Sequence, residues 1–134
     1  MSPDRWARAR RAAFWVYVPI LLTLTLWPKL RVPGPERSDL VAHFGAFGLL
    51  TGLMIGAAFF GSPLAWRNIL LPIPIIAAAG ACDEWLQAIP FFHRTCALDD
   101  WCANMGGVSL AVIGAIILRK LMLPGTPVGN DLGA

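Results

Sequence analysis

Four long stretches of the chain contain no Asp, Glu, Lys or Arg, and this pattern limits the folds that are open to it. They cover residues 12–28, 40–66, 68–82 and 101–118. A helix that crosses a bilayer needs roughly 20 mostly apolar residues, and lipid offers no hydrogen-bond partner to an open backbone. We therefore expect an all-α membrane protein, folded as a bundle of four transmembrane helices.

The expected helices lie at about residues 12–28, 39–60, 67–88 and 100–121, in a single domain at residues 1–123, and residues 124–134 are expected to form a disordered tail. Hydrophobic residues make up 57% of the chain and charged residues 14%, whereas a soluble domain carries about 25% charged residues. The stretch LWPKLRVPG after the first apolar run lacks a small-x-small cleavage site. The first helix is therefore expected to remain uncleaved.

The basic residues predict which way the bundle faces. If both termini are cytoplasmic, Lys29, Arg31, Arg37 and Arg94 fall outside, and the other seven of the 11 basic residues fall inside. Membrane proteins carry an excess of Lys and Arg on their cytoplasmic side. We therefore expect both termini in the cytoplasm and a multi-pass protein of the bacterial cytoplasmic (inner) membrane. The basic residues are explained by this inner rim, so no nucleic-acid partner is predicted.

Polar residues recur at helical spacing where three of the expected helices reach the outer face. The set comprises Asp39 and His43 on the second helix, Glu84 and Gln87 on the third, Arg94 in the loop that follows, and Asp100 and Asn104 on the fourth. Members on one helix are three or four residues apart and therefore share a face. Gly107 continues the last stripe and would allow another backbone to approach closely. The pattern predicts a shallow outer polar pocket, because Glu84 lies roughly 27 Å along its helix from Trp66.

Several of these residues also have a purely structural interpretation. Asp39 and Asp100 suit the positive N-terminal ends of their helices, and Asp99 suits an N-cap. Glu84 is harder to explain in this way, because the dipole disfavours an anion near a helix C-terminus. An ionisable group inside a membrane indicates function and needs a partner, and Arg94 is the nearest candidate.

Three further titratable residues give weaker signals. His43 suits a structural hydrogen bond to Asp39 or Glu84 as well as it suits a functional role. Asp83 and His93 are expected to be solvated rim residues.

The chain shows no recognisable catalytic or metal-binding motif. No nucleophile stands beside a base, so catalytic residues are unknown and binding is favoured over catalysis. No ligand spacing favours a zinc site built from His43 and cysteines, so neither a metal nor a cofactor is predicted. Cys82 and Cys102 are expected to pack as small apolar residues, and a disulfide between Cys96 and Cys102 is left open.

The polar residues also form an ordered motif. It reads DLVAHF at residues 39–44 and EWLQ at residues 84–87, followed by Pro90, Arg94, Asp100, Asn104 and Gly107. This order resembles the VanZ-like family of small bacterial membrane proteins, which shows D-K-x-x-H-F, then E-x-x-Q, a Pro-containing turn, Arg and D-x-x-x-N-x-x-G. Leu40 replaces the family lysine, and PFFHR replaces the usual Pro-Gly-Arg turn. Some members confer low-level resistance to glycopeptide antibiotics such as teicoplanin, so the resemblance implies a role in the cell envelope.

Two functions compete on this basis. In the first, a VanZ-like protein uses its extracytoplasmic pocket to bind the polar head of a lipid-linked cell-wall component, a glycopeptide or a lipopeptide, with membrane lipids as partners. In the alternative, the chain is an accessory or assembly subunit of a larger membrane complex, and the polar cluster is an internal clasp. An ion-coupled transporter is disfavoured, because its carboxylates should lie near the midplane and its sequence should show inverted repeats.

Overall fold

The computed structural model describes residues 3–27, 37–89 and 98–124, and the regular structure of these residues is entirely helical. The helices are α1 (Pro3–Leu26), α2 (Ser38–Ala57), α3 (Trp66–Leu70), α4 (Pro72–Gln87) and α5 (Leu98–Met122). When α3 and α4 are taken together as one span, four helices are long and apolar enough to cross a membrane. The expected all-α chain with four candidate membrane spans is thus confirmed.

Two of the spans differ from their expected bounds. α1 begins at Pro3 rather than near residue 12, so its first turns include the arginine-rich segment at residues 5–11. The third span is divided at Leu71, and Pro72 opens α4. Proline suits the first turn of a helix, because it has no backbone N–H to donate.

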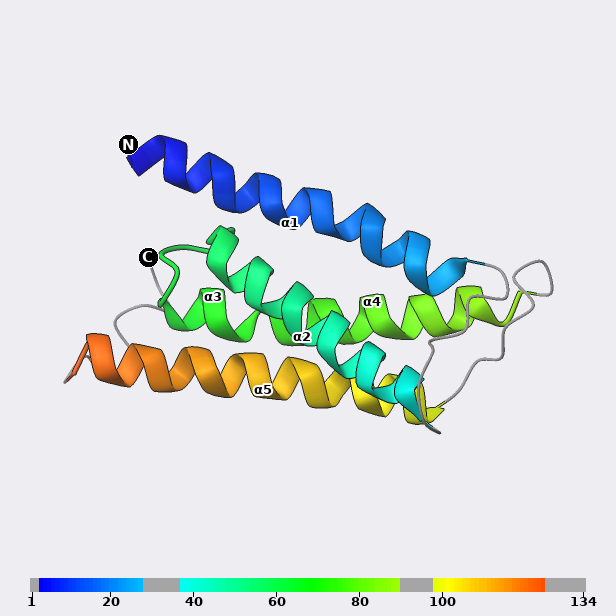
Figure 1. Cartoon of the computed structure of the whole chain (residues 1–134). Coiled ribbons are helices and arrows are strands. Elements are labelled where there is room, and N and C mark those ends of the chain that lie inside the picture. The colour runs from blue at the N-terminus through cyan, green and yellow to red at the C-terminus, as the bar shows by residue number, and fades with distance from the viewer. Residues whose placement is uncertain (1–2, 28–36, 90–97, 125–134) are drawn as a thin grey trace.

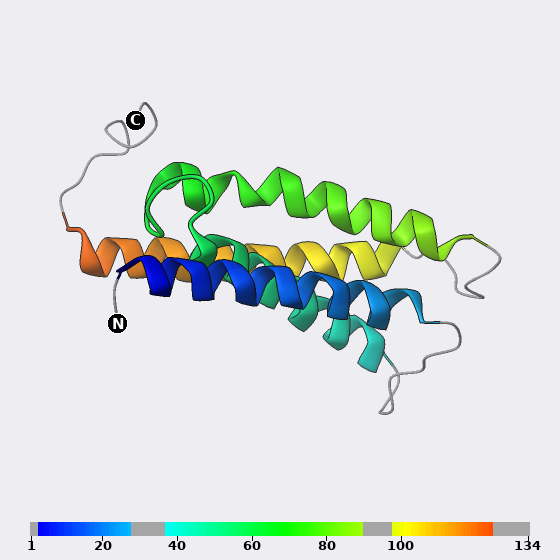
Figure 2. The same ribbon diagram turned by 90° about the horizontal axis from the view of Figure 1, so that it is seen from above.

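The helices alternate in direction along the bundle (Figure 1). The start of α1 and the end of α5 lie at one end, whereas α4 ends and α5 begins at the other, which we call the polar end. Figure 2 shows the same arrangement from above. α2 runs obliquely across the bundle and packs on both α1 and α5.

Glycines set the close contact between α2 and α5. A Cβ atom added to Gly107 would lie 2.0 Å from the carbonyl oxygen of Phe44 and 2.8 Å from the amide nitrogen of Gly48. No side chain fits into such a gap, so the two backbones can touch only because residue 107 is glycine. The contact also fixes the neighbouring residues, and brings His43 of α2 opposite Asn104 of α5.

A buried asparagine organises the connection between α2 and α3, at the end of the bundle opposite the polar end. Asn68 is fully buried, and its Nδ2 donates to the carbonyl oxygens of Ile55 at 2.7 Å and Pro63 at 3.1 Å. Its Oδ1 accepts from the backbone N–H of Phe60 at 3.2 Å. The side chain therefore bonds backbone groups of the turn at Phe60 and Pro63 and ties them to the last turn of α2 at Ile55.

Candidate functional site

A buried polar cluster lies where α2, α4 and α5 meet near the polar end. We use this name for His43, Glu84, Asp100 and Asn104, which expose 6%, 3%, 8% and 0% of their surfaces. His43 comes from the second turn of α2, Glu84 from the last turn of α4, and the other two from successive turns of α5. Helical spacing thus places one or two polar groups from each helix at a common point.

The imidazole of His43 is central to the cluster. Its Nδ1 lies 3.1 Å from Asn104 Oδ1 and 3.9 Å from Glu84 Oε1, and its Nε2 lies 3.8 Å from Asp100 Oδ2. An amide oxygen accepts but does not donate, so Nδ1–H is the donor to Asn104. Both carboxylate distances exceed the range of about 2.7 to 3.2 Å for a direct hydrogen bond to nitrogen.

The amide nitrogen of Asn104 has no hydrogen-bond partner among the described residues. Asn104 is fully buried, and its amide oxygen faces His43. A buried donor without a partner costs about 1 to 3 kcal/mol. The orphaned N–H₂ group therefore points to an additional acceptor inside the cluster.

A third buried carboxylate, that of Asp83, lies beside the polar cluster. Asp83 exposes 3% of its surface, accepts from Thr25 Oγ1 at 2.7 Å and accepts from Gln87 Nε2 at 3.0 Å. The expectation that Asp83 is a solvated rim residue is wrong, because the end of α1 covers this face of α4 and supplies Thr25 as a donor. Gln87 is fully buried, and its Nε2 donates a hydrogen bond to Asp83 Oδ2.

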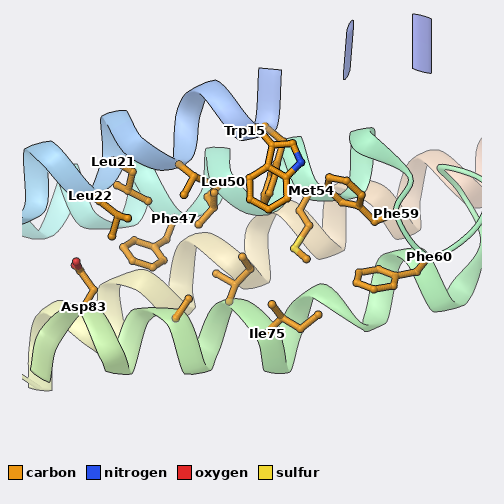
Figure 3. A pocket seen from close by; sticks show the side chains of 14 residues that line it. Trp15, Leu21, Leu22, Phe47, Leu50, Met54, Phe59, Phe60, Ile75 and Asp83 are labelled. Atoms are coloured by element: carbon orange, nitrogen blue, oxygen red, sulfur yellow. The ribbon is translucent and has the colours of Figure 1, made fainter. Parts of the chain in front are cut away.

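An apolar cavity of about 530 Å³ lies between α1, α2 and α4. Figure 3 shows its lining, with Phe59 and Phe60 toward one end and Asp83 at the other. Asp83 is the only polar residue among the described residues that line it. The cavity is therefore apolar along its length and ends at the carboxylate of Asp83. The next residue in the sequence, Glu84, belongs to the polar cluster.

Of the other expected site residues, Asp39 is exposed and Arg94 lies outside the described residues. Asp39 is exposed in the first turn of α2. Its place in the cluster stays a prediction. It lies one turn closer to the start of α2 than His43, where the positive end of the helix dipole stabilises an acid. Arg94 lies outside the described residues, as does His93, so the expected pair between Glu84 and Arg94 stays a prediction.

The cysteines also differ from expectation. Cys82 and Cys102 are exposed free thiols, so they are not packed against other described residues as small core residues are. They lie on the outer faces of α4 and α5, where a weakly polar thiol suits a lipid environment. Cys96 lies outside the described residues.

The structure also groups residues that can hold a metal ion. His43, Glu84 and Asp100 each offer one ligand atom, and these atoms lie within 4.8 Å of one another. No local spacing in the sequence predicts such a set, because each ligand comes from a different helix. The available signal was weaker: a histidine and two acids at helix ends that a four-helix bundle brings to the same face.

Comparison with known protein families, curated proteins and solved structures finds no match to the chain.

Proposed function

We propose that this chain is a VanZ-like integral membrane protein of the bacterial cell envelope that binds an amphiphile. The apolar part of the ligand occupies the cavity between α1, α2 and α4, and its polar head lies at Asp83 and the polar cluster. The observation that carries the proposal is the cavity itself, which is apolar throughout and ends at a buried carboxylate. The order of the motif residues, from Asp39 to Gly107, supports the family assignment.

Selectivity in such a site must come mainly from the polar head. An apolar chain gains little by moving from lipid into an apolar cavity, because both surroundings are equally free of water. Hydrogen bonds to the head are different, since groups buried in lipid find few other partners. Asp83 and the polar cluster offer carboxylate acceptors, an imidazole and the free amide donor of Asn104.

The chemistry of these groups favours a head rich in hydroxyl, amine or amide groups. Lipid-linked cell-wall components, glycopeptides and lipopeptides all carry such heads. Under the orientation predicted from the basic residues, the polar end faces the extracytoplasmic side, where these molecules are found. A polar end on this side would therefore be accessible to ligands of this class.

Lipid retention tests the proposal, with two variants on one helix. Ala79 lines the cavity, whereas its neighbour Ala78, which is likewise exposed, does not. Ala79→Phe should fill the cavity and Ala78→Phe should not. Native mass spectrometry in mild detergent should show a bound amphiphile in the wild type and in Ala78→Phe, and loss of that species in Ala79→Phe. Equal retention in the two variants, or no bound species in the wild type, would reject the proposal.

A second candidate function is an accessory subunit whose polar cluster is an internal clasp. It is favoured by the position of His43, which contacts polar groups of both α4 and α5. Breaking a buried charge pair by removing one partner costs about 3 to 5 kcal/mol, and less where water has access. A clasp predicts that Glu84→Gln lowers the melting temperature and that Arg94→Gln added to it restores part of the loss. A pocket predicts near wild-type melting with loss of the ligand.

A further inference from the structure

We propose that the polar cluster is a binding site for a divalent first-row transition-metal cation, with His43, Glu84 and Asp100 as its protein ligands. One ligand atom from each residue lies within 4.8 Å of the others. All three residues are buried, and they come from α2, α4 and α5. This inference goes beyond amphiphile binding and does not depend on the occupant of the cavity.

The distances between the imidazole and the carboxylates are too long for direct hydrogen bonds, and they leave room for an ion between the side chains. His43 Nε2 lies 3.8 Å from Asp100 Oδ2, and one ligand atom from each of the three residues lies within 4.8 Å of the others. Ligands at about 2.0 to 2.2 Å from a tetrahedral Zn²⁺ are roughly 3.3 Å apart. The separations in the cluster are larger than this, and rotation of the three side chains toward a shared ion would shorten them.

Asn104 prepares His43 for this role. The contact of His43 Nδ1–H with Asn104 Oδ1 at 3.1 Å leaves Nε2 with its lone pair, on the side that faces Asp100. Histidines that bind metals commonly donate their other ring N–H to an oxygen in this way, which fixes the tautomer and the ring orientation. Asn104 is thus a positioning residue, and Nε2 is the expected ligand atom.

The buried amide nitrogen of Asn104 is an independent sign of a missing group. It has no hydrogen-bond partner among the residues that the structure describes, and it belongs to the amide that already faces His43. Three protein ligands leave a fourth position open on a tetrahedral ion. A water molecule or a ligand oxygen in that position would accept a hydrogen bond from this N–H₂ group.

The ligand set determines the class of ion. One imidazole and two carboxylates combine a nitrogen ligand with hard oxygen ligands, and the two negative charges match a divalent cation. Imidazole suits Zn²⁺ and Fe²⁺, and carboxylate suits Mn²⁺ and Mg²⁺. The mixed set favours Zn²⁺ or Mn²⁺ over Mg²⁺, which is bound mainly through oxygen.

The test uses the full chain, purified in mild detergent and stripped with EDTA. Zn²⁺, Mn²⁺ and Mg²⁺ are each titrated alone by calorimetry, and bound metal is counted by elemental analysis after gel filtration. Asp99 is the matched control, because it is exposed and directly precedes the buried Asp100. The wild type and Asp99→Asn should bind one Zn²⁺ or Mn²⁺ per chain with equal affinity, whereas Asp100→Asn and Glu84→Gln should bind at least about tenfold more weakly.

Two results would overturn the site. One is a wild-type chain that does not bind one metal ion per chain. The other is equal affinity in Asp100→Asn and Asp99→Asn. Asn104→Leu provides a second readout, because it should weaken binding roughly 10- to 100-fold while leaving all three ligands in place. If Asp100→Asn does not fold, the wild-type titration and Glu84→Gln decide the question.

Discussion

His43 Nε2 on α2 lies 3.8 Å from Asp100 Oδ2 on α5, and both side chains are buried. The two residues are far apart in the sequence, and the close packing of their helices brings them together. This packing depends on Gly107, which lies two turns beyond Asp100 on the same helix. The chemistry of the polar end therefore depends on a backbone contact that itself carries no polar side chain.

Gly107→Ala should destabilise the bundle. The added Cβ would lie 2.0 Å from the carbonyl oxygen of Phe44, so α2 and α5 must separate. Overpacking of this kind costs about 1 to 3 kcal/mol and more where backbone must move. The melting temperature in detergent, followed by circular dichroism, should fall by several degrees.

The control for this change is Gly114→Ala on the same helix. No atom lies within 4 Å of the Cβ that this substitution adds. Alanine also has the higher helix propensity, by about 1 kcal/mol, so the melting temperature should stay equal or rise. A Gly107→Ala variant as stable as Gly114→Ala would contradict the packing described for α2 and α5.

Thr25→Val should destabilise the contact of α1 with α4. The Thr25 hydroxyl donates to Asp83 Oδ1 at 2.7 Å, and valine keeps its shape but removes the donor. Losing a hydrogen bond to a buried charged group costs about 1 to 3 kcal/mol. Thr23→Val is the matched control, because the exposed Thr23 hydroxyl bonds only within its own helix, to the carbonyl of Pro19. Equal melting temperatures for Thr25→Val and Thr23→Val would contradict a stabilising hydrogen bond between Thr25 and Asp83.

Asn68 variants should show a graded loss of stability. Asn68→Asp keeps an acceptor for the N–H of Phe60 but removes the donors to the carbonyls of Ile55 and Pro63, whereas Asn68→Leu removes all three contacts. The carbonyl of Ile55 keeps the N–H of Ala58 as a donor, so the loss comes mainly from Phe60 and Pro63, and a buried backbone group without a partner costs about 1 to 3 kcal/mol. In thermal unfolding experiments, the wild type should have the highest melting temperature. If Asn68→Leu has the same melting temperature as the wild type, the Asn68 side chain does not organise the connection between α2 and α3.

Reporter fusions test the predicted orientation. A reporter fused after Ala134 should give a cytoplasmic signal, and one inserted at residues 91–95 should give an extracytoplasmic signal. The physical basis is the arginine-rich start of α1, which favours the cytoplasmic side. The opposite pattern would place the polar end inside the cell and remove its access to envelope molecules.

The sequence was most informative where local spacing decides the outcome. Long apolar runs predicted the helices, and spacings of three and four residues placed His43, Glu84, Asp100 and Asn104 on inward faces. Asp39 shares their spacing but is exposed, because its spacing from His43 says nothing about how far the neighbouring helices extend. Proximity on one helix is local, whereas burial at a helix end depends on the lengths of its neighbours.

Contacts between distant helices could not be predicted from the sequence. The bond between Thr25 and Asp83 depends on which face of α4 is covered by α1, and the weak amphipathicity of these apolar helices does not specify that face. The cavity has the same origin, since it is the space left between three helices by their particular crossing. The shared position of one histidine and two acids likewise required the tertiary arrangement.

The central claim is that the cavity holds one class of amphiphile rather than bulk lipid. Photocrosslinking in cells tests it most directly, with benzoylphenylalanine placed either at Phe60, which lines the cavity, or at Leu110, which is 59% exposed on the surface of α5. Mass spectrometry of the adducts should show one amphiphile class enriched at position 60, and the ordinary membrane phospholipids at position 110. The same phospholipid mixture at both positions would contradict the account.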